Sequence, residues 1–117
     1  MDKIPKASKE SEAFLKCLVP ADTGVTIRPM FGNLSAFVNG NMYAGVFGDD
    51  LFVRLSEDDA AALLKVKGAS RFEPMKGRPM KGYVVVPRDW KGDAAKASPW
   101  VATALVWTRK MPSKGKS

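Results

Sequence analysis

The chain has 117 residues, of which 45% are hydrophobic and 26% are charged, and its formal net charge is +7. This size predicts one globular domain, because two ordinary domains would not fit. No apolar run approaches the ~18–20 residues that a membrane span requires, so we expect no membrane partner. The single cysteine, Cys17, cannot form an internal disulfide and suits a reducing cytoplasm, which is the compartment we expect.

The residue types that the chain lacks narrow its chemistry. It contains no histidine, which removes Ser–His and Cys–His nucleophilic pairs and histidine metal sites. One cysteine cannot build a thiolate zinc site, and neither a P-loop nor a dinucleotide-binding glycine motif is present. We therefore predict a protein that is not an enzyme, with no catalytic residues, no cofactor and no metal.

Charge is distributed unevenly along the chain. Residues 10–64 carry three basic and eight acidic side chains, whereas residues 65–96 carry nine basic and three acidic ones. Two basic segments, residues 1–9 and 112–117, are expected to be flexible tails on a single domain that spans residues 10–111. A basic surface can bind phosphates by releasing counterions, but surface lysines also serve simply to keep a protein soluble.

The first predicted element is a helix in "SKESEAFLKCLVP". Ser8 is a good N-cap, and Glu10 and Glu12 fall in the first turn, where the helix dipole favours carboxylates. The apolar residues that follow have helical spacing. Pro20 ends the helix, and "ADTG" predicts a turn.

Three strands are predicted next. "VTIRPMFGNLSAFVN" reads as the first strand, with a bend or bulge at Gly32-Asn33 and with Pro29 at a strand edge or entrance. Asn39-Gly40 predicts a tight hairpin, because both residues tolerate positive φ. "NMYAGVFG" and "LFVRL" complete an antiparallel meander.

Strand alternation predicts which side chains share a face of this meander. It places Tyr43, Gly45 and Phe47 on one face and Met42 and Ala44 on the other. Both faces are apolar, so we expect helices to cover one face and a partner to cover part of the other. Tyr43 and Phe47 are the candidate interface residues, and the partner would be another protein or a second copy of the chain.

A second and a third helix are predicted in the remaining sequence. Ser56 caps the second helix, and the carboxylates of residues 57–59 fill its first turn. Consecutive helical residues point about 100° apart, so these carboxylates do not converge on a metal. "ASRFEPMKGRPMKGYVVVP" predicts a short strand and then a strand at residues 82–86, and Ser98-Pro99 predicts the N-cap and first residue of the last helix.

The pentapeptide "RPMFG" at residues 28–32 is nearly repeated as "RPMKG" at residues 78–82. Because both copies precede strands, we interpret them as strand entrances. The second copy also offers cations and backbone amides to an anion, although an ordinary exposed loop has the same composition. The candidate contacts for nucleic acid or another anion are Lys76, Arg78, Lys81, Arg88 and Lys91.

The order of motifs resembles the N-terminal domain of the TfoX (Sxy) family of competence regulators. The resemblance rests on "RPMFGNLSAFVNGNMYAGVFGDDLFVRLSEDDAAAL" and on "FEPMKGRPMKGYVVVP" followed by an Ala/Trp-rich helix. It implies an α+β fold of the secretion-chaperone-like type: helix, three-stranded antiparallel meander, helix, two strands, helix. It also implies a bacterial cytoplasmic protein without enzymatic activity, here as a stand-alone single domain.

Three functions remain open at this point. The first is a regulatory domain that acts through protein contacts, since full-length members of the family regulate genes for DNA uptake. The second is nucleic-acid binding through residues 65–96 and the C-terminal tail. The third is a small-molecule site, which would need a deep pocket with convergent polar groups.

Overall fold

The computed structural model describes residues 6–30, 33–73, 77 and 80–112. These residues form an α+β fold, which is the predicted class. The elements are α1 (Lys9–Leu18), β1 (Val25–Met30), β2 (Asn33–Val38), β3 (Asn41–Phe47), β4 (Asp50–Arg54), α2 (Glu57–Leu64), β5 (Ser70–Arg71), β6 (Tyr83–Val85), the 3-10 helix η1 (Arg88–Trp90) and α3 (Ala94–Arg109).

The six strands of the described chain form one antiparallel sheet in the order β1-β2-β3-β4-β6-β5. The prediction of a single strand over residues 25–38 is wrong, because Val25 pairs with Val38 and Met30 pairs with Asn33 in a hairpin. The expected bend is therefore a full reversal of the chain, and the meander has four strands. A glycine followed by an asparagine suits a bend and a reversal equally well, so local sequence did not separate them.

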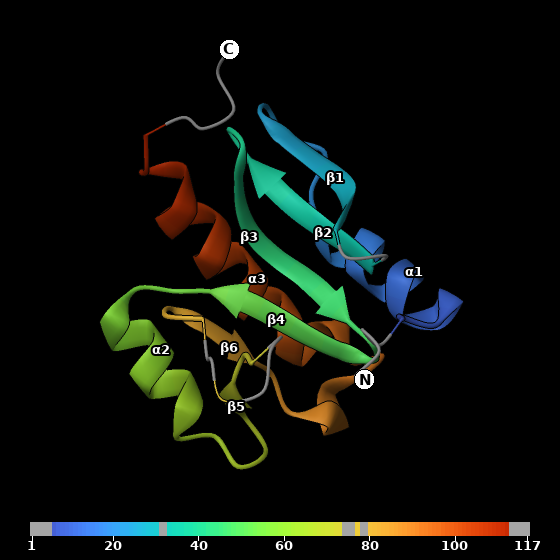
Figure 1. The fold of residues 1–117 in the computed structure, drawn as a ribbon, viewed down its shortest axis with the longest axis vertical. Coiled ribbons are helices and arrows are strands. Elements are labelled where there is room, and N and C mark those ends of the chain that lie inside the picture. The colour runs from blue at the N-terminus through green and yellow to red at the C-terminus, as the bar shows by residue number, and fades with distance from the viewer. Residues whose placement is uncertain (1–5, 31–32, 74–76, 78–79, 113–117) are drawn as a thin grey trace.

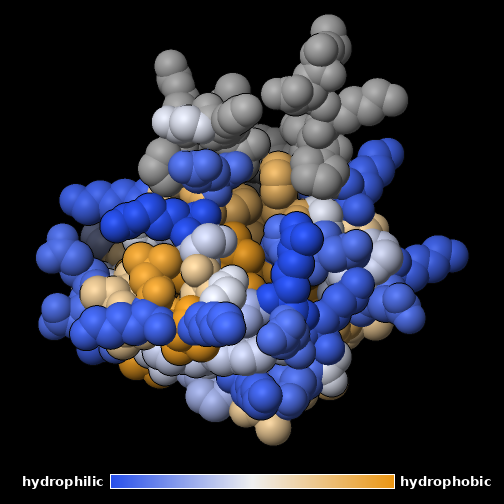
Figure 2. All heavy atoms as spheres, turned by 90° about the horizontal axis from the view of Figure 1, so that it is seen from below, coloured by the Kyte–Doolittle hydropathy of each residue, from blue (hydrophilic) through white to orange (hydrophobic). Residues whose placement is uncertain are grey.

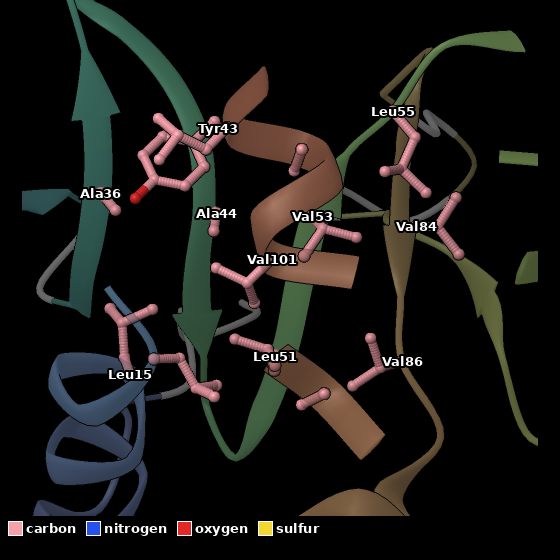
Figure 3. Packing of buried hydrophobic residues seen from close by; sticks show 14 of the residues in the cluster. Leu15, Ala36, Tyr43, Ala44, Leu51, Val53, Leu55, Val84, Val86 and Val101 are labelled. Carbon is pink, nitrogen blue, oxygen red and sulfur yellow. The ribbon is translucent and has the colours of Figure 1, made fainter. Parts of the chain in front are cut away.

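The three α-helices of the described chain pack on one face of the sheet. Figure 1 shows α3 lying behind β3 and β4. Leu15 of α1, Leu63 of α2 and Val101 of α3 are buried in one cluster with residues of the central strands. Figure 3 shows Leu15 and Val101 among side chains of the central strands, between the helices and the sheet. Each fully buried valine or leucine contributes on the order of 1.5–3 kcal/mol, so this layer provides the main stabilisation of the fold.

The start of α1 is fixed to the sheet through polar contacts. Ser8 caps the helix as predicted, with its hydroxyl accepting from the amide of Ser11. Asn33 of β2 accepts from the amide of Ala7 at 2.6 Å, and Asp49 accepts from the hydroxyl of Ser11 at 2.9 Å. These bonds set the position of α1 against β2 and the turn between β3 and β4.

The other helices differ in how well the sequence predicted them. The cap of α2 is confirmed, because the Ser56 hydroxyl accepts from the amide of Asp59. The predicted start of α3 is wrong: Asp93 is the N-cap, the helix begins at Ala94, and Pro99 lies inside it. Asp93 accepts from the amide of Lys96, and this earlier cap outcompetes the Ser98-Pro99 signal.

The described part of the chain contains no helix with the length and apolar character that a membrane crossing demands.

Candidate interaction surface

Of the three predicted anion-binding cations that the structure describes, Arg88 and Lys91 lie in one network with aspartates, and Lys81 lies apart from them. Arg88 donates to both carboxylate oxygens of Asp50, at 2.8 and 3.3 Å, and Lys91 lies 3.6 Å from the Asp49 carboxylate. These carboxylates raise the pKa of Arg88, with the hydrogen bond that Arg88 donates to Asp50 as the largest cause. Lys81 precedes β6 whereas Arg88 follows it, so the two cations lie at opposite ends of that strand.

The other two cations of the predicted set, Lys76 and Arg78, lie outside the described residues. Arg88 and Lys91 thus contribute to a network at the turn between β3 and β4, which also holds the start of α1. Asp49 is the centre of this network, and hydrogen bonds from Ser11 and Ser8 lower its pKa. The geometry explains these cations as partners of Asp49 and Asp50, and the nucleic-acid hypothesis stays a prediction.

Tyr43 does not share a face with Phe47, which corrects the predicted interface. Ala36 pairs with Ala44 and Phe37 pairs with Met42, so Tyr43 is the extra residue of a β-bulge. The bulge turns Tyr43 into the core beneath the helices, where it is 0% exposed. Figure 3 shows its ring beside Ala36 among the other core side chains.

Burial changes the chemistry of this tyrosine. Loss of solvation raises the pKa of Tyr43 to about 12, and its hydroxyl has no hydrogen-bond partner among the described residues. The buried hydroxyl of Thr108 on α3 likewise has no hydrogen-bond partner among the described residues. Tyr43 is therefore a packing residue, and its assignment to the interface is wrong.

The face of the sheet opposite the helices, here called the helix-free face, has a different composition. Sheet register and packing assign these residues to it: Thr26, Arg28, Ser35, Phe37, Met42, Gly45, Phe47, Phe52, Arg54, Tyr83 and Val85. In Figure 1 this face is turned towards the viewer, because α3 lies behind the sheet. Phenylalanine, methionine and arginine replace the valine, leucine and alanine of the other side.

Aromatic rings form a second, smaller cluster on the helix-free face. Phe52 stacks on Phe72 with ring centres 4.2 Å apart, and Phe47 meets the edge of Phe72 at 5.4 Å. The hydroxyl of Tyr83 donates to the carbonyl of Met42 at 3.1 Å and ties β6 to β3. Phe52, Phe72 and Tyr83 are buried, whereas Phe47 and Met42 remain partly exposed at the margin.

Two arginines lie over aromatic rings on this face. The guanidinium of Arg28 is 4.2 Å from the ring centre of Phe37, and that of Arg54 is 5.5 Å from the ring centre of Tyr83. Within the described residues neither arginine forms an ion pair, whereas Arg88 and Arg109 each pair with an aspartate. Sequence analysis missed both arginines, although their alternation with Thr26 and Phe52 along β1 and β4 was a usable signal.

A groove of about 560 Å³ lies at the β5–β6 end of the sheet, between the segment that follows α2 and the turn from β6 to η1. Lys67, Ser70 and Arg88 contribute polar groups to it, and Val85 contributes apolar surface. Figure 2 views this lower end of the molecule and shows hydrophobic surface framed by hydrophilic side chains. The volume is in the range of ligand pockets, but Arg88 already pairs with Asp50.

Two further observations limit the other candidate sites. No group of three or more metal-binding side chains is found in the parts of the chain that the structure covers. In the described part of the chain, the large hydrophobic side chain that is highly exposed is Val106, on the outer side of α3, at 59%. A single exposed apolar side chain is common on protein surfaces and does not define a site.

Comparison with known proteins gives one clear relationship. None of the curated proteins matches the chain. The family model of the TfoX N-terminal domain matches residues 18–106, which run from the end of α1 through the whole sheet into α3. The chain therefore belongs to the TfoX N-terminal domain family.

Proposed function

We propose that this protein is a non-enzymatic regulatory domain that acts through protein contacts, and that the helix-free face is its contact surface. One observation carries the proposal: all three α-helices of the described chain cover the same face of the sheet, so they leave the other face without a helical layer. A sheet with one face uncovered by helices can use that face to bind another molecule.

The composition of this face supports a protein partner. Phenylalanine, methionine and arginine are enriched in protein–protein interfaces relative to the rest of protein surfaces, whereas lysine and glutamate are depleted. Phe47 and Met42 are partly exposed, and Arg28 is exposed on the same face, two strands away. The regulatory part of the proposal follows from the family, whose full-length members regulate genes for DNA uptake.

The cellular setting that we propose is the bacterial cytoplasm. Cys17 is a free thiol on the exposed side of α1, which fits a reducing compartment. Nucleic-acid binding gains less support, because Arg88 and Lys91 are engaged by aspartates. The buried rings of Phe72 and Tyr83 also leave no free platform for stacking bases.

Site-specific photo-crosslinking in cells tests the proposal. A photoreactive residue placed at Thr26, which is exposed on the helix-free face, should yield one dominant protein adduct. The same residue placed at Lys16, which is exposed on α1, is the matched control and should yield none. An adduct that contains a second copy of the chain would identify a homodimer. Equal adducts from both positions, or none from Thr26, would count against the helix-free face.

A further inference from the structure

We propose that the helix-free face recognises an acidic, extended protein segment, and that Arg28 and Arg54 are the residues that select it. This inference rests on the proposed function and adds the chemistry of the partner. The carboxylates of the described chain lie mostly on helices and turns. Arg28 on β1 and Arg54 on β4 are the basic residues that the sheet register places on the helix-free face.

The sheet register defines these rows. Arg28, Ser35 and Gly45 stand in line on β1, β2 and β3, and the same row continues to Phe52 on β4. Arg54 lies in the neighbouring row, paired with Tyr83. The face therefore has one cation on the edge strand β1 and another on the interior strand β4, with small residues and rings between them.

Neither guanidinium is paired with a carboxylate among the described residues, so each has positive charge to offer a ligand. Arg28 lies over the ring of Phe37, whereas Arg54 lies near the ring of Tyr83 and also hydrogen-bonds to its side chain. Phe37 and Tyr83 are 4% and 8% exposed, so the arginines and their neighbours shield these rings from solvent. A partner would thus meet a guanidinium group at each of these two positions, and a carboxylate can form two parallel hydrogen bonds with a guanidinium edge that is free.

The spacing of the arginines suggests the form of the ligand. β1 and β4 are three strand spacings apart, which corresponds to roughly 14 Å at ~4.8 Å per spacing. An extended chain rises ~3.3 Å per residue, so two acidic residues about four positions apart would reach both guanidinium groups. Between them, Ser35 and Gly45 are buried, and the Phe52 ring lies against Gly45, so the ligand would lie over the aromatic layer rather than against the sheet backbone.

Burial of the aromatic rings favours protein over nucleic acid as the occupant, since arginine binds phosphates and carboxylates alike. Single-stranded nucleic acid gains much of its affinity from bases stacked on exposed aromatic rings. Phe37, Phe52 and Tyr83 are each less than one-tenth exposed, and Phe47 is only partly exposed at the margin, so the face offers guanidinium groups more than stacking surface. A segment that presents carboxylates and small apolar side chains matches this surface better than a chain of bases.

The test uses a labelled synthetic peptide with two glutamates about four residues apart, flanked by threonine and valine, and measures binding by fluorescence anisotropy at low salt. We expect binding to the full chain to weaken by about tenfold or more when both glutamates are glutamine. The double variant Arg28→Gln/Arg54→Gln should lose binding by a similar factor. Arg71→Gln is the matched control: it removes an exposed arginine whose register partner, Val84, belongs to the helix side.

Each outcome bears on the inference. Loss confined to the double variant supports it, provided that the thermal unfolding midpoint of the double variant stays close to that of the parent. An equal loss in Arg71→Gln would show non-specific attraction and overturn it. Tighter binding of oligothymidylate through Arg28 and Arg54 would assign the face to nucleic acid. Self-association that needs both arginines would assign it to a second copy.

Failure of this inference can be separated from failure of the proposed function. If the peptide does not bind but Thr26 still crosslinks to one protein, the face is correct and the acidic chemistry is wrong. If Thr26 gives no adduct in the cell, the proposed function itself fails.

Discussion

The two faces of the sheet bury apolar surface in different ways. Beneath the helices, aliphatic side chains such as Leu15, Val53 and Val101 form a continuous core with contributions from all three α-helices. On the helix-free face, the stacked rings of Phe52 and Phe72 bury one another, and apolar side chains at the margin stay partly exposed. The difference suggests that the helix side stabilises the fold and the helix-free side is kept for contact with another molecule.

Truncation on each face should show this difference most strongly. Leu15→Ala removes a side chain that is 0% exposed, and we expect it to lower the free energy of unfolding by about 2–5 kcal/mol. Met42→Ala on the helix-free face should cost less, because Met42 is already partly exposed. Urea unfolding followed by circular dichroism measures both variants. Equal losses would show that the two faces contribute alike to stability.

Overpacking of the helix-free face is the next largest expected effect. A Cβ added at Gly45 would lie 2.7 Å from the Phe52 ring and 2.7 Å from the Ser35 hydroxyl. Because the Phe52 ring is held by its stack on Phe72, we expect Gly45→Ala to destabilise the fold by about 1–3 kcal/mol. Removing the hydroxyl as well, in Gly45→Ala/Ser35→Ala, should recover part of the loss. Unchanged stability in Gly45→Ala would mean that the ring can move aside.

The two buried tyrosines should respond in opposite directions to loss of the hydroxyl. Tyr43→Phe removes a hydroxyl without a partner, so we expect stability to stay equal or to rise by up to about 1 kcal/mol. Tyr83→Phe removes the donor to the Met42 carbonyl and should cost about 0.5–1.5 kcal/mol. Thermal unfolding of the pair provides the comparison, and a larger loss for Tyr43→Phe would show that its hydroxyl has a partner after all.

Acid should weaken the contact between α1 and the sheet, with the smallest of these effects. The pKa of Asp49 lies below its ordinary value of 3.8, chiefly because the Ser11 hydroxyl donates to the carboxylate. When a carboxyl group has a lower pKa in the folded protein than in the unfolded chain, its ionised form stabilises the fold at pH values above the unfolded-chain pKa. That stabilisation is lost as the pH falls through the pKa of the folded protein. The urea midpoint should therefore fall less between about pH 6 and about pH 3 in Asp49→Asn than in the parent. Asp58→Asn, which removes an exposed carboxylate on α2, should keep the full dependence.

Local signals in the sequence predicted much of the fold. Ser8 and Ser56 cap α1 and α2 as expected, and Asn39 and Gly40 adopt φ values of 52° and 83° in the predicted hairpin. Pro29 lies in β1, an edge strand, where a missing amide donor is tolerated. Each of these features depends on a few adjacent residues, which is why sequence alone was enough.

Features that depend on distant residues were not predictable in the same way. The bulge at Tyr43 follows from the register of β3 against β2, and strict alternation cannot reveal an extra residue. The pairing of Arg88 with Asp50 joins residues 38 positions apart in sequence and removes a cation from the predicted binding set. Arg28 and Arg54 lie on the same face only because β1 through β4 form a single meander. The first hairpin of this meander was predicted as one strand, so their shared face could not be foreseen.

Mapping the partner's footprint on the domain tests the central claim most directly. Once crosslinking has identified the partner, it can be added to isotopically labelled domain, and the backbone amide signals can be followed by nuclear magnetic resonance. Contact through the helix-free face predicts the largest shifts at Thr26 and Arg28, which are exposed on β1, and small shifts at Ala102 and Val106, on the outer side of α3. The reverse pattern, with the largest shifts on α3, would contradict the account.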